Sequence, residues 1–528
     1  MGKLVLGLWF TALAFAQPDL DRIKASDLRA DLTFLAAPAM QGRMSLTPSS
    51  EAAIMWIAAE FQKAGVKPGY GDSYLQPVPL VEFRTARTSS LTISRSGKKL
   101  KFQAPAARVS FPIDGTRTGE LVFAGFGITA PELHYDDYAN INAKGKIVVV
   151  FDHEPQETLE TSVFNGKGNT RYANNRSKMF NAVAHGAIAM MVIPDPLHPT
   201  GAVRPAIEAL SGLPPRTGRP TQAIDGEASI PVINADASIS AELFRTAGKT
   251  AADVQRALDL TLKPQTVSFS GATGELSVTN EFGRRGRSYN VLGIVEGTDP
   301  MLKQETIVYS AHFDHDGLEL DGSLYPGADD NGSGTVGVVA LARALAASKP
   351  KRSLLLAVFA AEERGLLGSY YYTENPTRPL ASTRAVINFD MIGRNETPSK
   401  QTDGLIEIAA DTSNEVNVVG LKYSPDYRSA VERANRQVDL RISTKWDEDT
   451  VVNVLFRSDQ YPFLLHNIPA MWWFTGFHPD YHQITDTADR INYSKMEKIL
   501  KLAALTGLDF ASSEKPPAFL STGAPTAK

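Results

Sequence analysis

The sequence contains no cysteine. No disulfide can form, and no metal site can use thiolate ligands. Any metal site must therefore be built from histidine, aspartate and glutamate side chains. An exported protein of this length can still be stable without disulfides, because a chain of 528 residues can bury a large core.

The chain also lacks a strong excess of charge of either sign. Its formal net charge is −4, and charged residues make up 21% of the composition. This balance gives no indication of a nucleic-acid partner or of an anionic membrane surface as a partner. With 43% hydrophobic residues, the composition is that of an ordinary globular protein, and the length suits two or three domains.

No hydrophobic run is long enough to span a membrane comfortably. An apolar run at residues 4–15 follows Lys3 and ends in Ala14-Phe15-Ala16, a small-x-small cleavage site. We interpret residues 1–16 as an export signal, and we expect a periplasmic or extracellular protein that begins at Gln17 and has no stable membrane association. The alternative is a retained N-terminal anchor.

Apolar segments and helical periodicity alternate over residues 287–513. This alternation predicts an α/β fold with a mostly parallel sheet flanked by helices. The predicted strands are 289–295, 305–311, 353–360, 384–389, 405–410 and 469–474, and the predicted helices are 331–348, 365–374, 426–436 and 493–512.

Residues 115–262 form a separate unit with strands and a helix of their own. This unit shows no cluster of Asp, Glu and His at ligand spacing. We interpret its scattered histidines as structural or solvated: His134, His153, His185 and His198.

The stretch from Glu305 to Asp316 places His312 at the carboxyl end of an apolar strand. Open α/β sheets form their sites at that end of their strands. Asp314 can accept the imidazole N–H of His312 and fix its tautomer, as the partners of metal-bound histidines do. A metalloenzyme is therefore the first hypothesis.

Two acidic pairs follow. Asp329 and Asp330 stand in a Gly-rich turn before a predicted helix, where acidic residues could instead serve as a helix cap. Glu362 and Glu363 follow an apolar strand, and adjacent residues of an extended segment point in opposite directions. One carboxylate could thus bind a metal while the other faces the reacting water. The alternative is a pair of solvated acids that open a helix.

Asp390 and His482 complete the set. Asp390 ends another strand among apolar residues, so its charge needs a partner such as a metal or Arg394. His482 taken alone could equally be structural. Together, the two histidines and the carboxylates at strand ends of one sheet suit zinc or a similar metal, and the carboxylates raise the capacity to two ions.

In this order, the motifs resemble those of the M28 family of zinc aminopeptidases. The matching segments are His312-x-Asp314, Gly327-Ala-Asp-Asp-Asn331, Ala361-Glu-Glu363, Asn388-Phe-Asp390 and Tyr481-His482. Residues 115–262 look like the protease-associated domain that some members carry as an insertion. The resemblance implies a peptidase domain at 17–114 and 263–513 with an inserted α/β domain at 115–262. Beside the export signal at 1–16, the content of Pro, Ala and Thr predicts a flexible tail at 514–528.

The resemblance also implies two zinc ions per chain. One ion would be held by His312 and Asp390, the other by Glu363 and His482, with Asp330 as the bridge. Asp314 would orient His312, Glu362 would be the general base, and Tyr481 would stabilise the oxyanion. Two zinc ions ~3.5–4 Å apart can share a water molecule and lower its pKa towards neutrality.

Peptides are the expected substrates. An acidic site attracts a free amine, which favours an aminopeptidase, and Asp459 is the candidate contact for that amine. Phe477 is the candidate for an apolar substrate pocket, which it could line together with Trp472, Trp473 and Phe474, although all four could also be core. The inserted domain is expected to overhang the site and to limit substrates to short peptides.

Three other functions remain open. A carboxypeptidase or dipeptidase of the same fold would need a cation for the substrate carboxylate, and Arg394 or Arg457 could supply it. A glutaminyl-cyclase-like acyltransferase would use one zinc and lack the first histidine, so His312 argues against it. A non-catalytic receptor-like ectodomain would be expected to lose ligands, whereas this sequence has the complete set.

Overall fold

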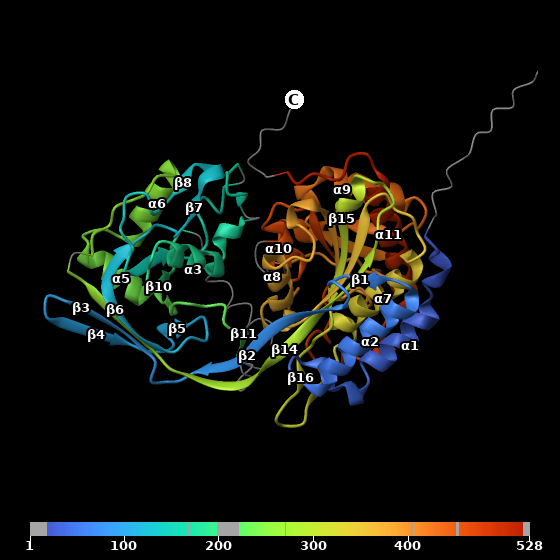
Figure 1. Cartoon of the computed structure of the whole chain (residues 1–528), viewed down its shortest axis with the longest axis horizontal. Coiled ribbons are helices and arrows are strands. Elements are labelled where there is room, and N and C mark those ends of the chain that lie inside the picture. Colours follow the sequence, from blue (N-terminus) through green and yellow to red (C-terminus); the bar gives the residue numbers. More distant parts are fainter. Residues whose placement is uncertain are drawn as a thin grey trace, which may run out of the picture.

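The computed structural model describes residues 18–159, 161–166, 169–197, 221–269, 271–402, 405–449 and 454–520. The predicted signal peptide and the last part of the predicted tail lie outside the described residues. Figure 1 shows two lobes that are joined along one edge by two long antiparallel strands, β2 (Leu75–Thr85) and β14 (Asn280–Val295). In the part of the chain that the structure describes, no helix is long and apolar enough to cross a membrane.

The larger lobe is built on one sheet with the strand order β11-β2-β14-β18-β15-β19-β22-β20-β21. The strands not yet bounded are β11 (Thr221–Ile224), β15 (Thr306–His312), β18 (Ser353–Phe359), β19 (Thr383–Phe389), β20 (Glu415–Val419), β21 (Arg441–Ser443) and β22 (Ala470–Phe474). At its centre, β18, β15, β19 and β22 run parallel to one another. The predicted α/β fold class is confirmed.

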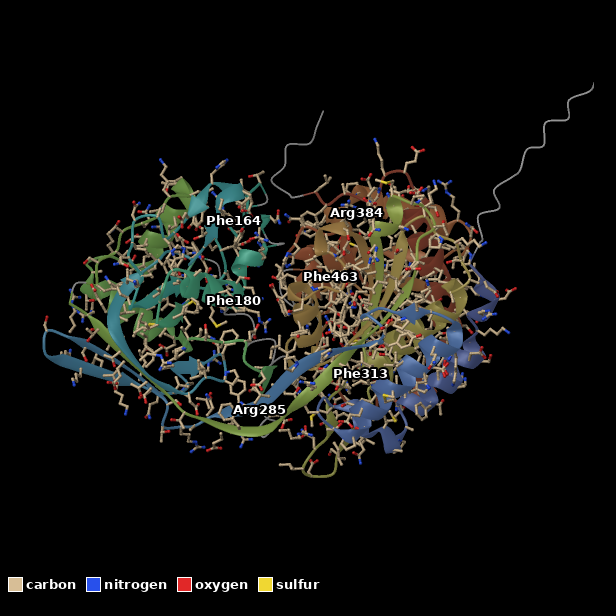
Figure 2. All side chains as sticks on the ribbon, in the orientation of Figure 1. Phe164, Phe180, Arg285, Phe313, Arg384 and Phe463 are labelled. Carbon is tan, nitrogen blue, oxygen red and sulfur yellow. The ribbon has the colours of Figure 1, made fainter. Side chains whose placement is uncertain are left out.

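Helices cover both faces of this sheet, so its central strands are buried on both sides. One face packs against α1 (Ala25–Leu35), α2 (Pro48–Ala64), α7 (Gly334–Leu345), α9 (Pro425–Asn435) and α11 (Tyr493–Ser512), and the other against α8 (Leu367–Glu374) and α10 (Gln460–Leu464). Along β15, Ile307 and Tyr309 join the first cluster, whereas Val308 joins the second, since side chains alternate along a strand. Phe463 of α10 belongs to that second cluster (Figure 2).

The boundaries of α2 follow from local sequence. Thr47 caps its first turn by accepting a hydrogen bond from the Ser50 N–H, and Pro48 occupies the position where no N–H is needed. Gly65 ends the helix in the left-handed conformation, with a φ of 82°. Ile54, Ile57 and Phe61 lie on the face of this helix that is buried against the core.

The predicted strand at 405–410 is wrong. The residues described there form turns and irregular chain, and the strand forms instead at β20, which is buried and pairs with both β22 and β21. Apolar character alone could not show which of two neighbouring segments would find a partner strand. Leu405 remains 40% exposed.

The smaller lobe has its own sheet, with the strand order β4-β3-β13-β6-β9-β10-β12-β5. Its strands are β3 (Ser90–Arg95), β4 (Lys98–Phe102), β5 (Ala107–Val109), β6 (Gly115–Phe123), β9 (Ile147–Phe151), β10 (Ala189–Ile193), β12 (Val232–Ala235) and β13 (Thr273–Val278). Helices α5 (Ala237–Thr246) and α6 (Ala251–Thr261) pack on one face, and α3 (Asn175–Ala184) packs on the other. Phe164 lies in the first of these two cores (Figure 2).

The smaller lobe is wider than the predicted insertion at 115–262. The chain leaves the larger lobe at Ala86 and returns at Thr279, and these two residues are joined by a backbone hydrogen bond of 2.9 Å. The boundary differs because β3 pairs with β13, a ladder between residues far apart in the chain that composition cannot reveal. One segment inside the range, β11, pairs with β2 at the edge of the larger sheet.

Candidate metal centre

Four neighbouring parallel strands of the larger lobe end at the same edge of the sheet. His312 is the last residue of β15, and Asp390 comes directly after β19. Glu362-Glu363 follows β18, and His482 lies in the loop after β22. Because parallel strands point the same way, segments distant in sequence bring these side chains together.

Asp330 lies between the two histidines. Its Oδ1 is 3.6 Å from His312 Nε2, and its Oδ2 is 2.8 Å from His482 Nε2. On one side, Asp390 Oδ2 is 3.5 Å from His312 Nε2, and on the other, Glu363 Oε2 is 3.6 Å from His482 Nε2. The five predicted ligands thus form two groups, and Asp330 offers one oxygen to each.

The turn that carries Asp330 depends on a glycine. Gly327 has a φ of 58°, and a Cβ there would lie 2.3 Å from the Asp330 carbonyl oxygen and 2.4 Å from the His315 ring. The Asp486 carboxylate accepts hydrogen bonds from the N–H groups of Asp329 and Asp330. The turn is therefore held by close packing and by a buried carboxylate that sequence reasoning did not assign.

Asp314 acts differently from its predicted role. His312 Nδ1 lies 3.1 Å from the backbone oxygen of Asp314, whereas the Asp314 carboxylate is 3.8 Å away. A carbonyl oxygen can only accept, so Nδ1 carries the proton and Nε2 is left as a ligand atom. The Asp314 carboxylate instead accepts from the N–H groups of Glu362, at 3.0 Å, and Glu363, at 3.4 Å.

Two further residues of the same loop support the second group. His482 Nδ1 lies 3.1 Å from Asp316 Oδ2, the pairing that orients a metal-binding imidazole. His315 Nδ1 lies 2.7 Å from Glu363 Oε1, which leaves Glu363 Oε2 on the side of His482. Sequence reasoning missed both roles, although Asp316 and His315 directly follow the His312 motif.

Arg43 connects the loop after β15 with the turn before α7. Its guanidinium is buried and donates to the backbone oxygens of Phe313, Pro326 and Gly327, as well as Leu35, at 2.7–2.8 Å. Burial lowers the pKa of Arg43 to about 10, although Asp314 and Asp486 oppose this effect. No motif in the sequence pointed to this residue, because its partners are backbone atoms of distant segments.

The buried carboxylates of the site outnumber the positive charges beside them. Burial raises the pKa of Glu362 well above its ordinary value, the His312 charge opposes this rise, and Asp390 and Glu363 add to it. Burial acts to raise the pKa of Asp330, but the charge and hydrogen bond of His482, together with the charges of His315 and His312, outweigh burial and hold that pKa below its ordinary value. A divalent cation would supply the missing positive charge.

The donor set fits such a cation. It consists of imidazole nitrogens and carboxylate oxygens, which suit zinc. His312 Nε2 is buried and has no hydrogen-bond partner among the described residues, and its neighbouring carboxylate oxygens at 3.5–3.6 Å are beyond ordinary hydrogen-bond length. A role as a metal ligand would explain why this buried nitrogen has no hydrogen-bond partner.

Tyr481 and Asp459 lie beside the two groups. The Tyr481 hydroxyl accepts from Arg457 Nη2 at 3.0 Å, and the Tyr481 ring contacts His482, with ring centroids 4.1 Å apart. Asp459 is buried, accepts from Ser369 Oγ at 2.5 Å, and interacts electrostatically with Glu362. Burial raises the pKa of Asp459 to about 7, although His312 opposes the shift.

Phe477 belongs to the core. Its side chain is 1% exposed and packs edge-on against Trp446, Phe474 and Tyr481. Trp472, Trp473 and Phe474 are buried as well. The predicted substrate contact of Phe477 is therefore not seen, because an aromatic cluster encloses the ring.

Comparisons with known proteins match the part of the chain that carries these residues. Residues 290–506 match the family model described as Peptidase family M28. Leucine aminopeptidase 2 of Arthroderma otae (strain ATCC MYA-4605 / CBS 113480) is 26% identical over 293 residues, which cover 51% of this chain and 52% of that protein. The protein YfbL of Escherichia coli (strain K12) is 31% identical over 209 residues, which cover 37% of this chain and 64% of that protein.

The chain thus spans less than two thirds of the length of these curated relatives. Among solved structures, the aminopeptidase from Aneurinibacillus sp. strain AM-1 aligns with a TM-score of 0.46 and 17% identity, over 96% of this chain and 97% of that one.

Proposed function

We propose that the chain is a di-zinc aminopeptidase of peptidase family M28, which removes N-terminal residues from peptides, because residues 290–506 match the model of that family. The observation that carries the proposal is the position of Asp330, with one carboxylate oxygen toward His312 and the other toward His482. A carboxylate between two imidazoles is what a two-metal site requires.

The ligands we assign are those of the two groups. His312 and Asp390 would hold one zinc ion, Glu363 and His482 the other, and Asp330 would contact both. When bound, zinc polarises a carbonyl oxygen and lowers the pKa of water. The protein's own part is to fix the ligands through the backbone oxygen of Asp314, which binds His312 Nδ1, and the carboxylate of Asp316, which binds His482 Nδ1.

Glu362 is the proposed general base. Its backbone N–H donates to the Asp314 carboxylate, and its Oε2 is 3.6 Å from His312 Nε2. The side chain therefore lies at the edge of the His312 group without an assigned ligand role. It would take a proton from the attacking water as the new C–O bond forms, and then pass that proton to the amine nitrogen, so that the peptide C–N bond breaks and the amine departs.

Tyr481 is the proposed oxyanion donor. Its hydroxyl oxygen accepts a hydrogen bond from Arg457, and the hydroxyl hydrogen can be given to the oxygen that gains charge on the attacked carbonyl. The two residues would act together next to the ligand His482.

The acidic surroundings favour a substrate with a free amine. Asp459 Oδ2 is buried without a hydrogen-bond partner among the described residues, so Asp459 is the proposed contact for the substrate ammonium group. The carboxypeptidase alternative loses one of its two candidate cations, since Arg394 Nη2 already pairs with Asp480 at 2.7 Å. Arg457 is the remaining candidate for that alternative.

The other parts of the proposal concern the whole chain. We assign the smaller lobe as a protease-associated-like insertion that restricts access to the site, and we assign the protein to the periplasm or the extracellular space.

The proposal is tested by metal analysis combined with blocked dipeptides. A strong chelator should abolish hydrolysis, and added Zn²⁺ should restore it, with at least two zinc ions per active chain by elemental analysis. Carboxyl-blocked dipeptides should be cleaved and amino-blocked ones should not. Active protein without transition metal, or cleavage of the amino-blocked peptides alone, would show that the assignment is wrong.

A further inference from the structure

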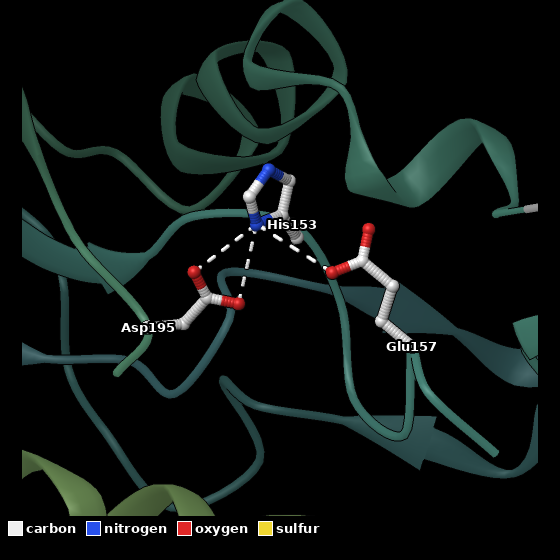
Figure 3. Close-up of side chains that lie close together, drawn as sticks. All are labelled: His153, Glu157 and Asp195. Atoms are coloured by element: carbon white, nitrogen blue, oxygen red, sulfur yellow. Dashed lines mark hydrogen bonds and ion pairs between the residues drawn. The ribbon is translucent and has the colours of Figure 1, made fainter. Parts of the chain in front are cut away.

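The smaller lobe contains a second group of metal-type side chains. His153, Glu157 and Asp195 meet beyond the carboxyl ends of β9 and β10 (Figure 3). These two strands are parallel neighbours, with Phe151 opposite Ile193, so the loops that follow them emerge side by side. Spacing in the sequence did not predict the group, because Asp195 is 42 residues beyond His153.

The three side chains converge on one imidazole nitrogen. His153 Nδ1 is 3.1 and 3.2 Å from the two Asp195 oxygens and 3.7 Å from Glu157 Oε2, as the dashed lines of Figure 3 show. The carboxylate side chains of Glu157 and Asp195 are 5% and 3% exposed, and that of His153 is 21% exposed. The group is therefore enclosed, and solvent reaches it only on the His153 side.

A buried amide lies next to this group. Asn169 Nδ2 donates to Glu157 Oε1 at 3.3 Å, and Asn169 Oδ1 is buried without a hydrogen-bond partner among the described residues. An amide oxygen left unpaired beside a carboxylate is costly unless a cation or water satisfies it. Amide oxygens are also common ligands of divalent cations.

The local charges leave the group negative. Lys178 is the buried cation nearby, and its Nζ donates to the backbone oxygens of Phe151 and His153 rather than to a carboxylate. Burial lowers the pKa of His153, but the hydrogen bond to Asp195 and the charges of Asp152 and Glu157 outweigh burial and raise this pKa to about 9. The same carboxylates that attract a proton to the imidazole would attract a metal ion.

We propose that His153, Glu157 and Asp195 bind one divalent transition-metal ion, such as Zn²⁺ or Mn²⁺, as a structural site of the smaller lobe. One imidazole and two carboxylates without thiolate suit these ions, whereas Ca²⁺ prefers six to eight oxygen ligands. The ion would link the loop after β9 to the end of β10. The site shares no residue with the catalytic edge and does not depend on the proposed function.

The test uses the full chain with the catalytic centre disabled by Asp330→Ala and His482→Ala. This background is titrated calorimetrically with Zn²⁺, Mn²⁺ and Ca²⁺ separately, and bound metal is counted by elemental analysis. His153→Gln is compared with His134→Gln, a matched change of an exposed histidine in the same lobe. The expected result is one equivalent of Zn²⁺ or Mn²⁺ that is lost with His153→Gln and kept with His134→Gln.

Thermal unfolding gives a second measurement. The metal should raise the midpoint of the background and of its His134→Gln derivative, because a ligand that binds only the folded state stabilises it. It should not raise that of His153→Gln. If His153→Gln does not fold, Asp195→Asn provides the same comparison. If the variants do not differ in bound metal, the proposal is overturned and His153 is the cation of an ion pair. Tighter binding of Ca²⁺ than of Zn²⁺ and Mn²⁺ would also overturn it.

Discussion

At the residue scale, the candidate centre is organised around single carboxyl oxygens. Asp330 presents Oδ1 to His312 and Oδ2 to His482, while Glu363 has Oε1 toward His315 and Oε2 toward His482. Since the two oxygens of each carboxylate face different neighbours, exchanging a carboxylate for a neutral side chain should change specific ligand contacts. Substitutions at this scale can therefore separate the proposed roles.

Asp330→Ala should remove both zinc ions. The bridge contributes to both groups, and the remaining ligands of each group would then be one histidine and one carboxylate, too few for tight binding. Elemental analysis after dialysis should find two zinc ions fewer per chain than in the parent protein, and activity should disappear. Asp321→Ala, at an exposed loop position, is the matched control and should keep the metal content of the parent protein. Loss of one ion alone would show that Asp330 does not bridge.

Glu362→Gln should mainly lower kcat, whereas Glu363→Gln should mainly weaken zinc binding. Glu362→Gln should keep both metal ions and lower kcat by ~10²–10⁴-fold, the usual contribution of a general base. Glu363→Gln should weaken zinc binding first, because this side chain is an assigned ligand. Metal content and kcat are measured on the same samples. A fully active Glu362→Gln protein would require the two roles to be reassigned.

At the element scale, the site depends on how loops are fixed to the sheet. Strand ends bring His312, Asp390 and the Glu362-Glu363 pair to one edge, but the loop after β15 and the turn before α7 still need a common support. Arg43 provides it through hydrogen bonds to backbone oxygens of both segments. Its position at the end of a short helical segment, Pro38–Arg43, thus ties the N-terminal region to the site.

Arg43→Ala should lower both stability and metal affinity. Four backbone oxygens would lose the guanidinium as a donor, of which Gly327 keeps the N–H of Gly332, and each buried group left unpaired costs about 1–3 kcal/mol. We expect the free energy of unfolding to fall by about 3 kcal/mol or more, with weaker zinc binding in the protein that remains folded. Denaturant unfolding and zinc titration measure the two effects. Arg22→Ala, at an exposed position, should change neither, and equal effects of both substitutions would contradict the role of Arg43.

At the scale of the whole molecule, the two lobes are joined by more than their shared strands. Asn174 Nδ2 donates to the Tyr370 hydroxyl at 2.7 Å, and the Arg176 guanidinium lies 4.7 Å from the centre of the Tyr370 ring. The Arg171 N–H also donates to the Leu465 backbone oxygen at 3.3 Å. These contacts place the smaller lobe against α8 and the end of α10, on the face of the sheet opposite α7 and α11.

Replacing residues 87–278 by a short Gly/Ser linker should keep the basic chemistry. Ala86 and Thr279 are hydrogen-bonded neighbours, so a short linker can join them without displacing β2 or β14. Cleavage of a small amino-acid amide should persist, and longer peptides should become better substrates relative to dipeptides. The ratio of kcat/KM for the two peptide lengths measures this.

A second deletion variant that keeps β11 serves as the control. This control is needed because the loss of β11 alone would leave the edge of β2 unpaired. A folded, zinc-loaded deletion variant that cannot cleave even the smallest amide would show that the smaller lobe contributes to the site.

Sequence alone determined the central sheet of the larger lobe and the identity of its metal-type residues. Buried strands were visible as apolar runs, and His312, Asp390 and the Glu362-Glu363 pair stood where those runs end, which is a local signal. The wrong strand at 405–410 shows the limit of that signal, since β20 was decided by its pairing with β22.

Tertiary structure alone decided everything that depends on contacts between distant segments. The smaller lobe extends to Ala86 and Thr279 because β3 pairs with β13, and Arg43 supports the site through backbone oxygens that have no sequence signature. Asp195 joins His153 for the same reason, through the register of β9 and β10. Side-chain type and periodicity are encoded locally, but which loops emerge side by side is set by strand pairing across the whole chain.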